Sequence, residues 1–258
     1  MNNPFLIQEG PTRRTPLFLI HDGGGTIFHY CLLQNLGRDV WGVYNPKFNN
    51  EEVWTGGLSE MAKVYVTMLK SVISCGNVII GGWSLGGCIA LEMAHLLQED
   101  VEIHVQGLVM VDSIYPKYRP DASESETYFL KFFETVPKDI RLNVQRCVDQ
   151  AVYMLSRWRG PDWSRQEVGK GSADNLFSET TGPPPAILIR ATEKLPTDWK
   201  RLDAEPEERL LRWDKYCDNF FKKVLDVPGH HFSMFERQNI NKITDAIRDA
   251  CELLEKLE

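Results

Sequence analysis

Short continuous apolar runs alternate with amphipathic stretches along the first 112 residues of the chain. Each run holds four to six residues and is typical of a strand buried on both faces. Two further runs, at 186–192 and 223–227, come late in the sequence. Strands that alternate with helices predict a mostly parallel central sheet with helices on both faces. The early runs lie at 17–20, 40–44, 77–81 and 107–112.

Apolar residues that recur at spacings of three and four predict the helices between these runs. The clearest case is 58–73, where seven apolar side chains fall on one helical face. Similar patterns predict a helix through 28–36, another over 87–97 and a last helix over 240–257.

Between residues 113 and 185 the alternation stops, and we expect no buried strand there. Tyr128–Val136 forms an aromatic helical face, and 144–155 forms a second apolar face. A stretch rich in Gly, Pro, Ser and Asp follows at 160–185 and predicts a loop. We interpret 113–185 as a helical lid inserted into a single domain that spans residues 1–258.

The composition excludes several classes of partner. The 258-residue chain has a formal charge of −7, with 43% apolar and 25% charged residues. This acidic balance lacks the basic footprint that a nucleic-acid backbone requires, so we expect no nucleic-acid partner. No apolar run reaches the roughly 18 residues of a membrane span, so we expect no membrane partner either. Six cysteines without C-x-x-C spacing indicate reduced thiols, a cytoplasmic location and no metal site.

Gly82-Trp83-Ser84-Leu85-Gly86 stands between a strand pattern and a helix pattern. A G-x-S-x-G sequence in that setting is a nucleophile elbow, in which the serine occupies a tight, strained turn. Only glycine leaves enough room two residues to either side of the serine. The sequence therefore predicts that the Ser84 hydroxyl projects from the turn as a nucleophile.

A serine nucleophile needs a base that accepts its proton and an acid that orients the base. Two neighbouring histidines, His230 and His231, follow the last predicted strand, and the G-x-H-F pattern favours His231. The acid has two candidates, because Asp112 and Glu193 each follow a predicted strand that ends at the same sheet edge. From the residues alone, the choice between these two carboxylates stays open.

Acyl transfer also needs N–H groups that donate to the oxyanion of the tetrahedral intermediate. One donor is expected to be the backbone N–H of Leu85, which follows the nucleophile. We expect the other from the glycine-rich loop after the first predicted strand. Gly23, or else Gly24, can bring its backbone close to a substrate there.

Four segments together resemble the thioesterase domains of polyketide and non-ribosomal peptide synthases, of a fungal type. The resemblance covers nearly the whole chain and implies an α/β-hydrolase fold with a helical lid. Asp112 lies 28 residues after Ser84, as the acid does in that family, so the resemblance implies Asp112 rather than Glu193. The four segments are 19–26, 81–87, 109–113 and 229–232.

The resemblance implies an enzyme that releases a polyketide or related acyl chain from the phosphopantetheine arm of an acyl carrier protein. Ser84 would form an acyl-enzyme, and water or an internal nucleophile would complete the release. The carrier protein, in cis or in trans, is the implied partner. No cofactor of the enzyme's own is implied, because the pantetheine belongs to the carrier. Four lid aromatics would line the acyl chamber: Tyr128, Phe129, Phe132 and Phe133.

Two other functions fit parts of the pattern. The first is a free-standing serine esterase or lipase that acts on small oxygen esters with the same three residues. The second is a non-catalytic binding module on a hydrolase scaffold. Such modules usually lack a member of the triad, whereas Ser84, Asp112 and His231 are all present here. No motif distinguishes hydrolysis from lactone closure or carbon–carbon cyclisation.

Overall fold

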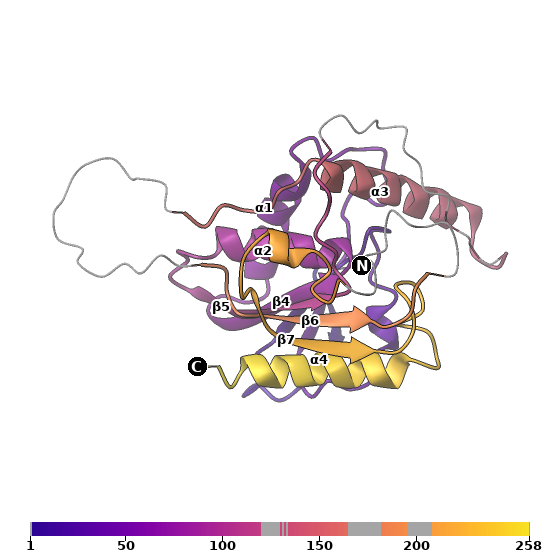
Figure 1. Ribbon diagram of the computed structural model, residues 1–258. Helices are drawn as coiled ribbons and strands as arrows, with labels where there is room; N and C mark the ends of the chain where they lie inside the picture. Colours follow the sequence, from indigo (N-terminus) through magenta and orange to yellow (C-terminus); the bar gives the residue numbers. More distant parts are fainter. Residues whose placement is uncertain are drawn as a thin grey trace, which may run out of the picture.

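Seven strands form one sheet in the order β1-β3-β2-β4-β5-β6-β7 in a computed structural model of the chain (Figure 1). The structure describes residues 2–119, 130, 132, 134–164, 182–195 and 208–257. Neighbouring strands pair in parallel except β1, which runs antiparallel to β3 at one edge. The strands are β1 (Phe5–Gln8), β2 (Leu17–Ile20), β3 (Val40–Val43), β4 (Gly76–Trp83), β5 (Ile103–Val111), β6 (Ala186–Ala191) and β7 (Phe221–Val227).

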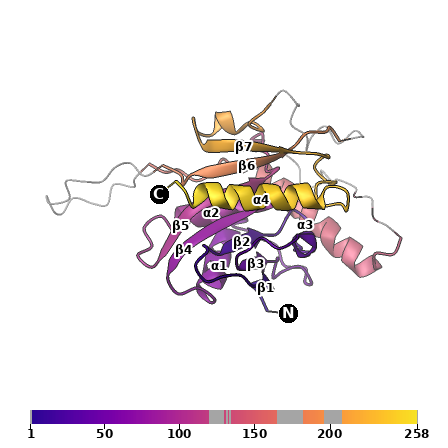
Figure 2. The ribbon, with the colours of Figure 1, turned by 90° about the horizontal axis from the view of Figure 1, so that it is seen from below.

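The predicted, mostly parallel sheet with helices on both faces is confirmed. Helices α1 (Gly57–Lys70) and α2 (Leu85–Leu96) cover one face, and α4 (Ile240–Leu254) covers the other (Figure 2). Strand β2 is apolar at every position because both of its faces are buried. Phe18 and Ile20 pack in the core beneath α1 and α2, whereas Leu17 and Leu19 pack against the α4 side.

Helix α3 (Lys138–Ser156) contains the apolar face predicted over 144–155, and it lies on the same side of the sheet as α1 and α2 (Figure 1). Ala151 and Met154 join the core that those two helices form with the sheet. Of the rest of the predicted lid, residues 120–129, 131, 133 and 165–181 lie outside the described residues. None of the helices in the described ranges has both the length and the apolar character needed to cross a bilayer.

Two local expectations were wrong or incomplete. The segment 28–36 forms only a short 3₁₀ helix, Tyr30–Leu32. Its buried residues Tyr30, Leu33 and Leu36, with Ile27 just before the segment, recur every three positions, which suits 3₁₀ rather than α geometry. Edge strand β1 was not predicted, because its four half-buried residues show no alternation of apolar and polar side chains.

The start of α2 touches the end of β2 backbone to backbone. A Cβ atom on Gly86 would lie 2.3 Å from the Ile20 carbonyl oxygen and 2.8 Å from that of His21. A Cβ atom on Gly82 would lie 2.6 Å from the same Ile20 oxygen. The Tyr30 hydroxyl closes this junction, since it donates to the Ile20 carbonyl (2.6 Å) and accepts from the Trp83 N–H (2.8 Å).

We expect Gly86→Ala to lower the free energy of unfolding by about 3 kcal/mol or more, because its Cβ would overlap carbonyl oxygens of a buried strand end. Urea unfolding followed by tryptophan fluorescence measures this change. Gly182→Ala is the control, since its Cβ would have no atom within 4 Å, and we expect a change within about 0.5 kcal/mol. Equal stability of the two variants would contradict the close contact.

Candidate active site

Ser84 occupies the turn between β4 and α2 and has φ 56° and ψ −117°. A non-glycine residue in this region is strained, and the strain persists only where the surroundings fix the backbone. The contacts of Gly82 and Gly86 supply that constraint, and the Ser84 N–H donates to the Val111 carbonyl at 2.9 Å. The local geometry is therefore that of the predicted elbow, with the half-buried serine at its tip.

Asp112 and His231 form a buried pair at the same sheet edge. Ser84 and Asp112 directly follow Trp83 and Val111, which are paired across β4 and β5. The His231 Nδ1–H donates to the Asp112 Oδ2 at 2.8 Å, and only 5% of Asp112 and 6% of His231 is exposed. Since the carboxylate only accepts, Nδ1 carries the proton and Nε2 is left as a base.

The second Asp112 oxygen is also occupied. Its Oδ1 accepts the N–H of Ala191 at 2.9 Å, and the Asp112 N–H donates to the Ile189 carbonyl at 2.7 Å. The carboxylate thus lies in a fixed position between β5 and β6. Such a carboxylate can hold one imidazole tautomer and one ring orientation.

Glu193, the other candidate acid, is exposed and does not contact His231 among the described interactions. Its Oε1 accepts the Gly229 N–H at 3.1 Å, and its own N–H donates to the Gly229 carbonyl at 2.9 Å. Glu193 therefore braces the loop that carries His231 rather than the imidazole itself.

His230 belongs to the same braced loop. Its N–H donates to the Ser233 hydroxyl at 2.9 Å, and its carbonyl accepts the Ser233 N–H at 2.8 Å. Gly229 has φ 93°, and a Cβ atom there would meet the Ser233 hydroxyl at 2.7 Å. This tight turn aims His231, not its neighbour, at Asp112.

Trp83 connects the elbow to the imidazole. Its indole centroid lies 5.2 Å from the His231 ring, and residue 83 immediately precedes the serine. Among the described residues, no hydrogen bond joins the Ser84 hydroxyl to His231. Hydrogen bonds between catalytic groups are often long before substrate binds and shorten in the complex. The three residues thus share one sheet edge, with the acid–imidazole contact already formed.

The glycine-rich loop after β2 forms a turn whose amide groups are unequally available. The Gly24 N–H donates to the Asp22 Oδ1 at 2.8 Å, and the Gly25 N–H donates to the Asp22 carbonyl at 3.0 Å. In the part of the chain that the structure describes, the Gly23 N–H makes no hydrogen bond. Of the two glycines predicted as oxyanion donors, Gly23 is therefore available and Gly24 is already engaged. Leu85, the other predicted donor, begins α2, where N–H groups lack helical partners.

Two side chains near this site were not predicted, Asp22 and His29. The Asp22 Oδ2 lies 3.9 Å from the His29 Nδ1, and the His29 ring lies 4.8 Å from Trp83. Burial raises the pKa of Asp22, while His29, Gly24, His231 and Thr26 oppose that rise. Burial also lowers the pKa of His29. An aspartate directly before consecutive glycines is a turn signal that could have identified Asp22.

His21 stabilises the same turn by a hydrogen bond to its backbone. Its Nδ1–H donates to the Asp22 carbonyl at 2.6 Å, so its Nε2 accepts the Tyr65 hydroxyl proton at 2.6 Å. Burial lowers the pKa of His21 to about 4, which keeps the ring neutral near pH 7. His21 is thus a structural histidine.

Helix α3 covers the outer side of the glycine turn. Cβ atoms on Gly23, Gly24 and Gly25 would contact Ala151 at 3.6 Å, Val144 at 3.2 Å and Cys147 at 3.0 Å, respectively. Of the predicted lid aromatics, Phe132 is described and half-buried. Tyr128, Phe129 and Phe133 lie outside the described residues.

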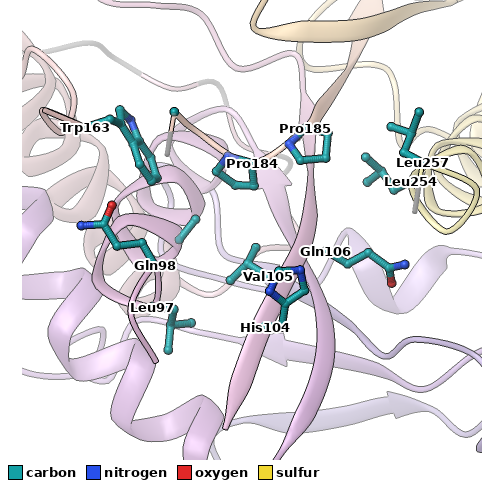
Figure 3. Close-up of a pocket in the computed structure, with 12 residues that line it drawn as sticks. Leu97, Gln98, His104, Val105, Gln106, Trp163, Pro184, Pro185, Leu254 and Leu257 are labelled. Carbon is teal, nitrogen blue, oxygen red and sulfur yellow. The ribbon is translucent and has the colours of Figure 1, made fainter. Parts of the chain in front are cut away.

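A cavity of about 320 Å³ lies at the other end of the sheet (Figure 3). Val105 comes from the start of β5 and Pro185 directly precedes β6, whereas Leu254 ends α4 and Leu257 follows it. Because Asp112 follows the far end of β5, this cavity does not belong to the Ser84 site.

Comparisons with known proteins agree with this geometry. The family model described as Thioesterase domain matches residues 15–251. The chain is 34% identical to the probable thioesterase gloN of Glarea lozoyensis, over 98% of each chain. It is 36% identical to the thioesterase frbD of Dothideomycetidae sp., over 98% of this chain and 94% of that relative.

Solved structures show the same fold. The NocB thioesterase domain, in a covalent complex with a fluorophosphonate nocardicin G analog, has a TM-score of 0.67 at 20% identity, over 92% of this chain and 94% of that one. The Vlm2 thioesterase domain has a TM-score of 0.63 at 16% identity, over 96% and 98%. The predicted α/β-hydrolase fold is confirmed, and the chain belongs to the thioesterase domain family.

Proposed function

We propose that this thioesterase releases a polyketide or related acyl chain from the phosphopantetheine arm of an acyl carrier protein, through an acyl-enzyme on Ser84. The single observation that carries the proposal is the 2.8 Å hydrogen bond between Asp112 and His231 beside the strained Ser84 turn. A carboxylate-oriented imidazole next to a half-buried serine in a strained turn is suited to acyl transfer.

Acylation uses the groups at the sheet edge in order. The Ser84 oxygen attacks the thioester carbonyl carbon while the His231 Nε2 takes the hydroxyl proton. The resulting oxyanion accepts hydrogen bonds from the backbone N–H groups of Leu85 and Gly23. The C–S bond then breaks, and the pantetheine sulfur leaves as a thiol with the proton from His231.

Deacylation repeats these steps with a different nucleophile. Water, or a hydroxyl or carbon nucleophile within the acyl chain, attacks the Ser84 ester and gives hydrolysis or intramolecular cyclisation. His231 accepts the proton of the attacking group and returns it to the Ser84 oxygen. Asp112 stabilises the imidazolium in both halves. The carrier supplies the pantetheine, so the enzyme needs no cofactor of its own.

We expect Ser84→Ala to reduce turnover of acyl-pantetheine thioesters by at least about 10³-fold, because no other group forms the acyl-enzyme. Intact-mass spectrometry should show the acyl mass on the wild type and no adduct on the variant. Ser59→Ala, at an exposed position of α1, is the control and should behave as the wild type. Full turnover by Ser84→Ala would contradict the nucleophile, and a wild type without adduct or turnover would favour a non-catalytic binding module.

The preferred leaving group, a thiol or an alcohol, distinguishes a carrier thioesterase from a general esterase or lipase. We expect a higher kcat/KM for the pantetheine thioester than for an oxygen ester of the same acid. A kcat/KM that is higher for the oxygen ester would favour the esterase instead. Carrier-bound and free pantetheine thioesters, compared at equal concentration, test whether the protein part of the carrier is recognised.

Asp112→Asn should lower kcat by about 10³-fold or more, since the amide no longer fixes the imidazole tautomer that leaves Nε2 free. Glu193→Gln keeps an oxygen that can accept the Gly229 N–H, so kcat should change less than about threefold. Both rates are measured with the same thioester at saturating concentration. The reverse order of the two effects would transfer the role of the acid to Glu193.

A further inference from the structure

We propose that Asp22 is a positioning residue of the active site. Its carboxylate holds the turn after β2 in the one conformation that leaves the Gly23 N–H free for the oxyanion. The inference rests on the proposed acyl transfer by Ser84, and it adds a residue that acts through the backbone rather than on the substrate.

The hydrogen bonds of the turn assign this role. Asp22 binds the two glycines that follow Gly23, through its side chain at 2.8 Å for Gly24 and its carbonyl at 3.0 Å for Gly25. The Gly25 carbonyl in turn accepts the Asn45 N–H at 3.0 Å. With the later amides engaged inside the turn, the amide of Gly23 is the one left for a ligand.

Glycines cannot hold this conformation by themselves. Three consecutive glycines have the widest choice of backbone angles of any tripeptide. Gly25 already lies in the left-handed region, with φ +78°. An acceptor that stays in the turn is therefore needed, and Asp22 supplies it as an Asx-type contact.

The surroundings of Gly24 are closely packed. Gly24 is buried, and α3 closes the outer side of the turn, where Val144 would be 3.2 Å from a Cβ atom at position 24. A buried N–H group without a partner is strongly disfavoured. Without the Asp22 carboxyl, the turn must therefore rearrange so that Gly24 finds another acceptor.

A negative charge on Asp22 would oppose oxyanion formation, whereas its hydrogen bond to Gly24 supports the turn. A carboxylate next to the oxyanion would repel the charge that forms there, although it would favour the His231 imidazolium. The titratable groups around Asp22 are His29, His231, Tyr30 and Cys147. Burial raises the pKa of Asp22, which favours its neutral form beside the oxyanion. The proposed role rests on the Oδ1 acceptor, which the Gly24 N–H contacts at 2.8 Å, and not on a negative charge.

Asparagine separates these two contributions. Asp22→Asn keeps an oxygen at the Oδ1 position and resembles the neutral carboxylic acid, whereas Asp22→Ala removes the acceptor. We expect Asp22→Ala to lower kcat by about 10- to 100-fold with KM within about threefold, because it weakens one oxyanion donor. Asp22→Asn should restore kcat to within about threefold of the wild type.

Asp39→Ala is a matched control far from the serine. The Asp39 Oδ1 also accepts a glycine N–H, that of Gly10, at 2.8 Å, but it precedes β3 at the amino end of the sheet. Loss of that contact should leave kcat unchanged. If Asp39→Ala lowered kcat as much as Asp22→Ala does, a general effect on stability would explain both, and the inference would be wrong.

Two readouts test positioning directly. Amide hydrogen exchange at Gly24, measured by NMR, should be fast in Asp22→Ala and slow in the wild type and in Asp22→Asn. A trifluoromethyl ketone analogue of the thioester forms a tetrahedral oxyanion on Ser84. Its Ki should rise in Asp22→Ala by the same factor as kcat/KM falls, while the Kd of the product acid stays unchanged.

The outcomes distinguish this inference from the proposed function. A wild type that releases no acyl chain from thioesters, by hydrolysis or by cyclisation, would refute the function, but slow amide exchange at Gly24 would still show that the turn is formed. An active wild type with an equally active Asp22→Ala would refute only the role of Asp22. If Asp22→Asn lost as much activity as Asp22→Ala, the charge of Asp22 would matter and the acceptor role would be wrong.

Discussion

The backbone contact between β2 and the start of α2 is the constraint on which the site depends. Gly82 and Gly86 have no room for a Cβ atom, because the carbonyl oxygen of Ile20 lies against both. That contact sets the backbone of Ser84 in its strained region and places the loop after β2 beside the helix start. Backbone packing between β2 and α2 therefore brings the two predicted sources of oxyanion donors, the Leu85 N–H and the glycine turn, close together.

The sheet was predictable because each internal strand is buried on two faces and reads as a continuous apolar run. Strand β1 was not, since it lies at an edge and is half-buried along its whole length. The segment 28–36 was assigned to a helix from apolar spacing alone. In the structure its buried residues recur every three positions, as in a 3₁₀ helix, and the Tyr30 hydroxyl is hydrogen-bonded to the Ile20 carbonyl and the Trp83 N–H.

The site was predictable to the extent that it is local in sequence. The elbow is encoded within five residues, whereas the choice between Asp112 and Glu193 depends on how neighbouring strands and their loops pack. Both carboxylates follow parallel strands at one edge, and only the loop geometry brings Asp112 to His231 and Glu193 to Gly229. The hydrogen bond from Gly24 to Asp22 was likewise invisible to an argument from glycine content.

Helix α3 lies over the glycine turn so closely that a Cβ atom on any of the three glycines would contact one of its side chains. The predicted lid, of which this helix is a part, would line the acyl chamber under the proposed function. Here the same helix packs against the turn that holds Gly23, the proposed oxyanion donor, so under the proposed function it would affect the rate of the reaction as well. A chimera that exchanges this helix for that of a relative would have to keep the small residues facing the glycines, Val144, Cys147 and Ala151, in order to preserve the reaction itself.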